Sequence, residues 1–364
     1  MQKQKNSAGI WLTAVLVLLM ILMLVQSDLV RESAAAAMRD CGTVIIPVLF
    51  PLAVLSALLI GSRAFAAAAG RLMRPLCKRL RFSEEAGCAI LIGFLCGFPL
   101  GSNAVCRLYQ SGRLGKEEAD RLLALCHNTG PSFIVGYIGA ALFDSIRFGI
   151  FLYMTEILSA ILLAFVAARK APRPLPHPPK AASDGSISLS AALRDSAAAM
   201  LTVAASVVFF RTLSAVLGGV IPCLALPIPR AVLLALLECT SGVGAGAATG
   251  GAVGFALAGF SLGFSGAAVL SQAAAAASDA GLSIKPCLAA KLRQGLISAF
   301  AAVLFTLGGA VPASKITPVT VDYRLLTAFE VALLTLALII PSVVEIIMHR
   351  CRRANSRAED AASR

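Results

Sequence analysis

The stretch Gly97-Phe98-Pro99-Leu100-Gly101-Ser102-Asn103 interrupts an apolar segment that runs from residue 86 to residue 105. Gly97, Pro99 and Gly101 disfavour a continuous helix, because glycine adds backbone freedom and proline lacks an N–H donor. A break at membrane depth leaves N–H and C=O groups without partners unless they face protein, water or a ligand. We therefore expect a re-entrant helical hairpin whose second arm begins at Ser102 and Asn103, with free amide donors at its N-terminus.

Three further breaks of this kind follow along the chain. They are His127-Asn128-Thr129-Gly130-Pro131, Glu238-Cys239-Thr240-Ser241-Gly242 and Ser261-Leu262-Gly263-Phe264-Ser265-Gly266. Corresponding breaks in two halves of a chain point to a transporter-type binding site. The alternative is that the glycines only allow helices to pack closely. That alternative explains the glycine-rich run 244–254, but not Gly-Phe-Pro together with Asn-Thr-Gly-Pro.

The composition is that of an integral membrane protein. The chain has 364 residues, of which 58% are apolar and 14% charged, and its mean hydropathy is +0.83. Soluble domains average about 25% charged residues. The net charge of +13 lies in short clusters between apolar spans, as in cytoplasmic loops, and so does not indicate nucleic-acid binding. The ten cysteines form no CxxC pair, so we interpret them as packing residues and expect no metal site.

The number of membrane crossings depends on the two segments with a central glycine break. If both cross fully, the chain has ten crossings; if both are re-entrant, eight remain. The hairpin topology places 25 of the 32 Lys and Arg residues inside, including the cluster 285–293, and the positive-inside rule therefore favours it. We predict an all-α polytopic protein of the bacterial cell membrane with both termini cytoplasmic. The expected spans are residues 10–26, 41–61, 122–143, 148–168, 198–219, 252–278, 295–312 and 325–347, with a basic loop at 63–81.

The order of elements predicts an inverted repeat. Arg39-Asp40 precedes the first set of elements and Arg194-Asp195 the second, and each set contains a span, a hairpin, a broken helix and a further span. Opposed hairpins of this kind place their tips near the bilayer midplane and bind solute there. The expected parts are a signal-anchor helix (1–38), a first repeat (39–168, hairpin about 86–110, broken helix about 116–143), a cytoplasmic linker (169–194), a second repeat (195–312, hairpin about 230–251, broken helix about 252–278), a C-terminal transmembrane helix (313–349) and a basic disordered tail (350–364).

Ionisable residues inside apolar segments are costly and often functional. Glu238 lies at the third break and either contacts a cation, proton or solute, or caps the hairpin turn. We expect Arg211 and Glu156 to pair as a structural bridge. Gln272 either donates to a solute or bonds a neighbouring helix, and His127 is expected to be structural. The candidate solute-binding residues are Gly97, Pro99, Ser102, Asn103, Asn128, Thr129, Glu238, Thr240, Ser241, Phe264, Ser265 and Gln272.

Catalytic motifs are missing from the sequence. It contains no Walker A run, no Gly-x-Ser-x-Gly and no His-Glu-x-x-His, and its loops are too short to fold a catalytic domain. We therefore expect a protein that is not an enzyme and has no cofactor. A coupling Na⁺ or H⁺ is left open, as is homo-oligomerisation in the bilayer.

Several motifs together resemble a known family. They are residues 93–102 (GFLCGFPLGS), 115–123 (GKEEADRLL), 128–136 (NTGPSFIVG) and 263–266 (GFSG) with Ser271-Gln272, Lys285-Pro286 and Lys291. This pattern is similar to the YlbJ-like family of sporulation integral membrane proteins, which carry the nucleoside-recognition (Gate) domain. The resemblance covers roughly residues 40–310. It implies a membrane protein of endospore formers, made in the mother cell, located around the forespore and needed for the spore cortex.

The Gate domain in turn resembles the core of concentrative nucleoside transporters, whose hairpin tips and broken helices hold the solute and the coupling cation. This likeness matches Glu238, Thr240 and Ser241 to the second hairpin tip, and Phe264-Ser265 to the second broken helix. The first tip lacks the Gln-Thr-Glu type of nucleoside contact. The implied solute is therefore a small polar one, nucleoside-like or not. The alternative function is a non-transporting scaffold that helps to assemble the cortex machinery.

Overall fold

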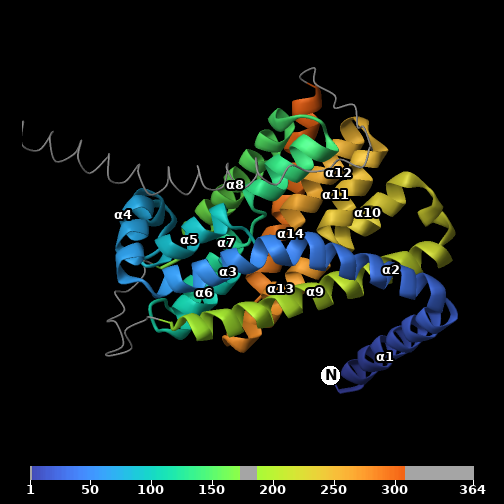
Figure 1. Ribbon diagram of the computed structural model, residues 1–364, viewed down its shortest axis with the longest axis horizontal. Helices are drawn as coiled ribbons and strands as arrows, with labels where there is room; N and C mark the ends of the chain where they lie inside the picture. The colour runs from blue at the N-terminus through green and yellow to red at the C-terminus, as the bar shows by residue number, and fades with distance from the viewer. Residues whose placement is uncertain (1, 173–186, 308–364) are drawn as a thin grey trace, which may run out of the picture.

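The computed structural model describes residues 2–172 and 187–307, and within these ranges the chain is helical and contains no strand (Figure 1). The predicted all-α fold is thus confirmed. The predicted C-terminal transmembrane helix at 313–349, the tail at 350–364 and most of the linker at 169–194 lie outside the described residues.

The part of the chain before the linker forms helices that end at the predicted breaks. They are α1 (Gln2–Val25), α2 (Ser27–Asp40), the π-helical η1 (Cys41–Ile45), α3 (Ile46–Gly61), α4 (Arg63–Leu80), α5 (Ala86–Leu95), α6 (Leu100–Gln110), α7 (Lys116–Cys126), the π-helical η2 (Ser132–Leu142) and α8 (Ile146–Ala168). Helices α5 and α6 occupy the range of the first hairpin. Helices α7 and η2 occupy that of the first broken helix.

The part after the linker has a similar order of elements. It consists of α9 (Leu189–Val220), the 3₁₀ helix η3 (Pro222–Ala225), α10 (Pro227–Leu237), α11 (Cys239–Thr249), α12 (Gly251–Phe264), α13 (Gly266–Asp279) and α14 (Lys285–Leu307). Helices α10 and α11 occupy the range of the second hairpin, and α12 and α13 that of the second broken helix. The re-entrant character of the hairpins and the inverted repeat stay predictions.

Long apolar stripes face outward on two of the helices. Large apolar residues spaced four apart are exposed along α8 (Ile146, Ile150, Met154, Leu158, Leu162) and along α14 (Leu288, Leu292, Leu296, Phe300, Leu304). Such a stripe lies on one face of a helix, and in a membrane protein that face contacts lipid. The outward face of these helices therefore suits the hydrocarbon core of a bilayer.

Four described helices are long and apolar enough to cross a membrane, namely Ile146–Ala168, Leu189–Val220, Gly251–Ala280 and Lys285–Leu307. The number rises to six if each of two bent pairs counts as one span. These pairs are α1 with α2, bent by 91°, and α3 with α4, bent by 89°. The chain is thus a multi-pass membrane protein. The predicted count of eight is not confirmed.

The predicted basic loop at 63–81 is instead the helix α4. Ser62 caps its N-terminus by accepting a hydrogen bond from the backbone N–H of Phe65 at 3.3 Å, and the alanine-rich run that follows favours helix. The helix ends at Arg81, which has a left-handed φ of 55°. The prediction of a loop was wrong because it rested on the basic residues, whereas the alanines between them strongly favour a helix.

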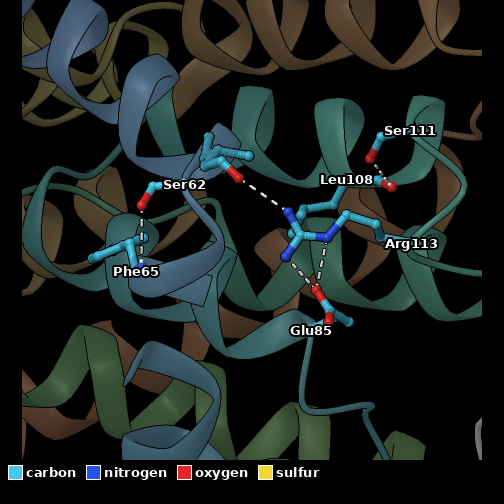
Figure 2. Close-up of polar contacts among 7 residues, drawn as sticks. Ser62, Phe65, Glu85, Leu108, Ser111 and Arg113 are labelled. Carbon is cyan, nitrogen blue, oxygen red and sulfur yellow. Dashed lines mark hydrogen bonds and ion pairs between the residues drawn. The ribbon is translucent and has the colours of Figure 1, made fainter. Parts of the chain in front are cut away.

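An arginine joins the end of α3 to the segments that flank α5 and α6 (Figure 2). Arg113, in the turn after α6, donates to the carbonyl oxygen of Ile60 at 3.0 Å and forms an ion pair with Glu85, just before α5. The Nε–Oε2 distance in that pair is 2.7 Å. These contacts hold the start of α5 and the end of α6 against the end of α3.

Helix α9 lies along α2 and α3 (Figure 1). Ion pairs connect it to the first half at two levels: Arg211 pairs with Asp40, and Asp195 pairs with Arg107 of α6 at 3.0 Å. The predicted pairing of Arg211 with Glu156 is wrong. Arg211 lies on the side of α9 that meets α2, whereas Glu156 is 1% exposed on the inward side of α8.

Candidate functional site

The first hairpin tip lies directly against the first helix break. The backbone N–H of Phe98 donates to the carbonyl oxygen of Asn128 at 2.6 Å. Gly97 has a φ of 72°, and a Cβ added there would overlap the backbone nitrogen of Gly130. Only glycine allows this conformation and this approach without strain. The glycine of the tip is therefore needed to bring two backbones together.

A histidine lies within this contact. His127 is fully buried, its Nδ1 lies 2.8 Å from the hydroxyl oxygen of Ser102, and its ring stacks on Phe98 at a centroid distance of 5.4 Å. The interactions join the start of the break to the start of α6. They agree with the structural role expected for His127.

Four side chains gather beside the break, and we call them the polar cluster: Asn128, Glu156, Lys291 and Gln294. None is more than 1% exposed. Lys291 Nζ donates to Oε1 of Gln294 at 2.9 Å and to Oδ1 of Asn128 at 3.3 Å. The carboxylate of Glu156 accepts a hydrogen bond from the backbone N–H of Thr129 at 2.7 Å. The cluster thus joins α8, α14 and the break between α7 and η2.

Backbone carbonyls fix which way the two amides of the cluster point. Asn128 Nδ2 donates to the carbonyl oxygen of Leu125 at 2.6 Å, and Gln294 Nε2 donates to that of Glu156 at 2.9 Å. Gln294 Nε2 also donates to Oδ1 of Asn128 at 3.1 Å. Both amide oxygens accept from Lys291, and that of Asn128 is shared with the NH₂ group of Gln294.

Some buried polar atoms here have no hydrogen bond to any described residue. They are Nε2 of His127, Oγ1 of Thr129 and Oε2 of Glu156. Unpaired buried polar atoms are uncommon and costly in proteins, and they often mark a place that water or a ligand occupies. Within the described ranges, no three His, Cys, Asp or Glu side chains gather to form a metal site. The unpaired atoms therefore suit a polar solute or water.

The second hairpin tip has Glu238 at its centre. Glu238 is 2% exposed and caps α11: its carboxylate accepts from the backbone N–H of Thr240 at 2.9 Å and of Ser241 at 2.8 Å, and from the Ser241 hydroxyl at 2.6 Å. Carboxylates at a helix N-terminus satisfy free amide donors and the helix dipole. The structure thus shows Glu238 as a helix cap, which is one of the two roles expected for it. The same contacts would hold the carboxylate in place for a solute.

The second helix break touches this tip. Ser265 has a left-handed φ of 73°, and a Cβ on Gly266 would lie 2.9 Å from the backbone nitrogen of Cys239. A Cβ on Gly263 would lie 2.8 Å from the carbonyl oxygen of Gln294 and 2.8 Å from Oγ of Ser298. Helix α14 therefore packs against the second break and also bonds to Asn128 at the first, so a continuous chain of contacts links all four breaks.

The candidate residues from the sequence fall into two groups. Gly97, Pro99, Ser102, Asn128 and Thr129 lie together around the first break and are buried. The second group, Glu238, Thr240, Ser241, Phe264 and Ser265, lies around the second break and tip. Asn103 is partly exposed on α6, and Gln272 is 4% exposed, nearly two turns into α13.

Two central residues were missed by sequence reasoning. Lys291 was counted in a cytoplasmic cluster with Lys285 and Arg293, but it is fully buried and bonds to Asn128, so that count was wrong. A signal existed: Lys291 and Gln294 are three residues apart, which places them on one face of a helix, and Gln294 stands in an apolar run. Lys285 and Arg293 are exposed, as expected for residues on the other faces.

The chain is similar to a curated membrane protein over part of its length. It is 29% identical over 122 residues to the sporulation integral membrane protein YlbJ of Bacillus subtilis (strain 168). The match covers 33% of this chain and 30% of that protein, so the chain spans less than a third of the length of the curated relative it matches. No protein-family model matches the chain. No solved structure has a significant match to it.

Proposed function

We propose that this protein binds a small polar solute at the polar cluster and moves it across the membrane, without catalysing a reaction. The observation that carries the proposal is the polar cluster itself. Four buried polar side chains, two of them ionisable, connect a helix break to α14 at a depth where polar groups are expensive. Broken helices with polar residues at their ends are a common way in which transporters bind solutes near the midplane.

The cellular setting of the proposal comes from the similarity to a sporulation integral membrane protein. We propose that the protein acts in the mother-cell-derived membrane around the forespore, that it has a Gate-like inverted repeat, and that the solute contributes to cortex formation. The unpaired Oε2 of Glu156, Oγ1 of Thr129 and Nε2 of His127 would contact that solute. They offer one acceptor, one hydroxyl and one ring nitrogen, which fits a ligand with both donors and acceptors.

Replacing Asn128 with alanine should abolish most of the solute binding. Asn128 Oδ1 accepts from both Lys291 and Gln294, so its loss removes one acceptor from each of two buried donors and loosens the break, although Lys291 keeps the Gln294 amide oxygen and Gln294 keeps the Glu156 carbonyl oxygen. We expect at least a tenfold loss of affinity. A panel of nucleosides, nucleobases and amino acids, screened by thermal shift on purified protein, identifies a ligand, and uptake into proteoliposomes then measures its transport.

The matched control is Thr202→Ala. The Thr202 hydroxyl is exposed and bonds only within α9, to the carbonyl oxygen of Ala198 at 3.1 Å. This variant should keep full binding and uptake. Normal cortex formation by Asn128→Ala in a sporulating host, with loss of cortex upon changes in the cytoplasmic loops, would instead support the scaffold function.

The proposed topology places the turn between α6 and α7 in the cytoplasm. A single cysteine introduced as Gln110→Cys should therefore be inaccessible to a membrane-impermeant maleimide added to intact cells, and should react after the cells are opened. Arg147→Cys, in the exposed first turn of α8, should react from outside. Cys223 is the exposed one among the described cysteines, so the background carries Cys223→Ser and Cys351→Ser. External labelling at position 110 would refute the hairpin topology.

A further inference from the structure

The ammonium group of Lys291 lies among oxygen atoms that would suit a free monovalent cation. Its Nζ donates to two amide oxygens, Oε1 of Gln294 at 2.9 Å and Oδ1 of Asn128 at 3.3 Å. The Lys291 side chain is 0% exposed, and Gln294, one of its partners, also bonds to the backbone carbonyl oxygen of Glu156, which is 1% exposed. Amide and carboxylate oxygens are the ligands that hard cations prefer.

The orientation of the Asn128 and Gln294 amides is fixed by backbone carbonyl groups and does not depend on Lys291. Carbonyl oxygens of Leu125 and Glu156 hold the NH₂ groups of Asn128 and Gln294, so both amide oxygens would face the same point if the ammonium were absent. The backbone N–H of Thr129 holds the carboxylate of Glu156 in the same way. The oxygens are therefore preorganised around a positive charge.

A positive charge at this place would also lower the cost of an ionised Glu156 carboxylate. An uncompensated carboxylate in a buried, membrane-embedded site is strongly unfavourable, and Oε2 of Glu156 has no hydrogen bond to a described residue. The other basic side chains in the described α7, η2, α8 and α14 lie elsewhere: Arg121 bonds to the carbonyl oxygens of Leu80 and Arg81, and Lys116, Arg147, Lys285 and Arg293 are exposed. Lys291 supplies the positive charge.

We infer that Lys291 is a built-in cation that fills a monovalent cation site formed by the amide oxygens of Asn128 and Gln294, while the buried carboxylate of Glu156, held by Thr129, balances its charge. The inference deepens the proposed function, and its consequence for transport rests on that function. Solute uptake by the wild type should need no Na⁺, because Lys291 already fills the position of a coupling cation. Removal of the ammonium opens the site, which then takes Na⁺ or K⁺ from solution.

The test is the salt dependence of thermal stability in purified protein. Wild type, Lys291→Ala, Lys291→Met and the double variant Lys291→Ala/Glu156→Gln are heated in NaCl, KCl or choline chloride at equal ionic strength. The wild-type Tm should be the same in all three salts, within about 1 °C. The Tm of Lys291→Ala should be lowest in choline and should rise by at least about 3 °C as NaCl or KCl goes from 10 to 300 mM, because a ligand that binds only the folded state stabilises it.

The other two variants are matched controls. Lys291→Met fills the volume with apolar atoms and should be destabilised equally in every salt. The double variant has lost both charges and should likewise show no dependence on the cation. A wild-type Tm that rises in Na⁺ over choline overturns the inference, as does a Lys291→Ala Tm that is the same in all three salts.

Folding failure is also informative. If Lys291→Ala is recovered only when Na⁺ or K⁺ is present throughout purification, the inference is supported. If it is unfolded in every salt while Lys291→Met folds, the inference is overturned, because the opened site then holds no free cation. These readouts measure stability, so an absence of solute flux refutes the proposed function and leaves the cation result standing.

Discussion

Replacing Gly101 with alanine is expected to lower the free energy of unfolding by about 3 kcal/mol or more. A Cβ on Gly101 would overlap the carbonyl oxygen of Cys126 and lie 2.6 Å from the Cα of Gly93. Both are backbone atoms, so no side chain can rotate away and α6 must move from α5 and α7. Overpacking of this kind usually costs about 1–3 kcal/mol, and a clash with backbone lies at the upper end. Thermal or steric-trapping unfolding in detergent measures the loss.

Gly244→Ala is the matched control for this change. Gly244 is also within a helix, α11, but nothing lies within 4 Å of an added Cβ there. Alanine has the higher helix propensity, by about 1 kcal/mol. This variant should be neutral or slightly stabilised. Equal effects of the two changes would contradict the close contact of the first hairpin with the first break.

Replacing Glu156 with alanine is expected to cost about 3 kcal/mol of stability, the lower end of the range for removing one charge from a buried pair, because the carboxylate and the Lys291 ammonium are both buried without direct contact. Lys291 would remain fully buried without an opposite charge, and the backbone N–H of Thr129 would lose its acceptor. The double variant Glu156→Ala/Lys291→Met should be more stable than Glu156→Ala by at least about 1 kcal/mol, because it removes the unbalanced charge.

Asp40→Asn is the control for the removal of an acidic residue from a pair. Asp40 pairs with Arg211, but these side chains are 52% and 27% exposed, and solvent weakens their interaction. Loss of such a pair costs less than about 1 kcal/mol. Unfolding measurements on the wild type, Glu156→Ala, the double variant and Asp40→Asn complete the comparison. A double variant no more stable than Glu156→Ala would show that the two charges do not depend on each other.

Several features of the fold could be read from the sequence because they depend on local chemistry. Gly97 and Pro99, two residues apart, together disfavour a continuous helix, and the helices do stop at Leu95 and resume at Leu100. Asn128 and Thr129 were selected as candidates because they precede a Gly-Pro break, and both are buried beside the hairpin tip. In these cases the signal is a backbone property of a few consecutive residues.

The pairing of the charges could not be read in the same way. Arg211 and Glu156 were paired because both are ionisable and lie in apolar segments, yet Arg211 pairs with Asp40 and Glu156 lies beside Lys291. Lys291 was hidden by its neighbours Lys285 and Arg293, which are exposed on other faces of α14. A charge count along the chain does not distinguish the faces of a helix.

By itself, the sequence determined an all-helical, multi-pass membrane protein whose helices break at four glycine-containing points. Apolar length, glycine and proline act locally, so they need no knowledge of what packs against them. Only the tertiary structure decided that the breaks are linked through α14 and that Lys291, more than 160 residues from Asn128, supplies the charge at the first of them. Partners of buried charges are chosen by the packing of distant helices, because desolvation makes each charge depend on whichever groups surround it.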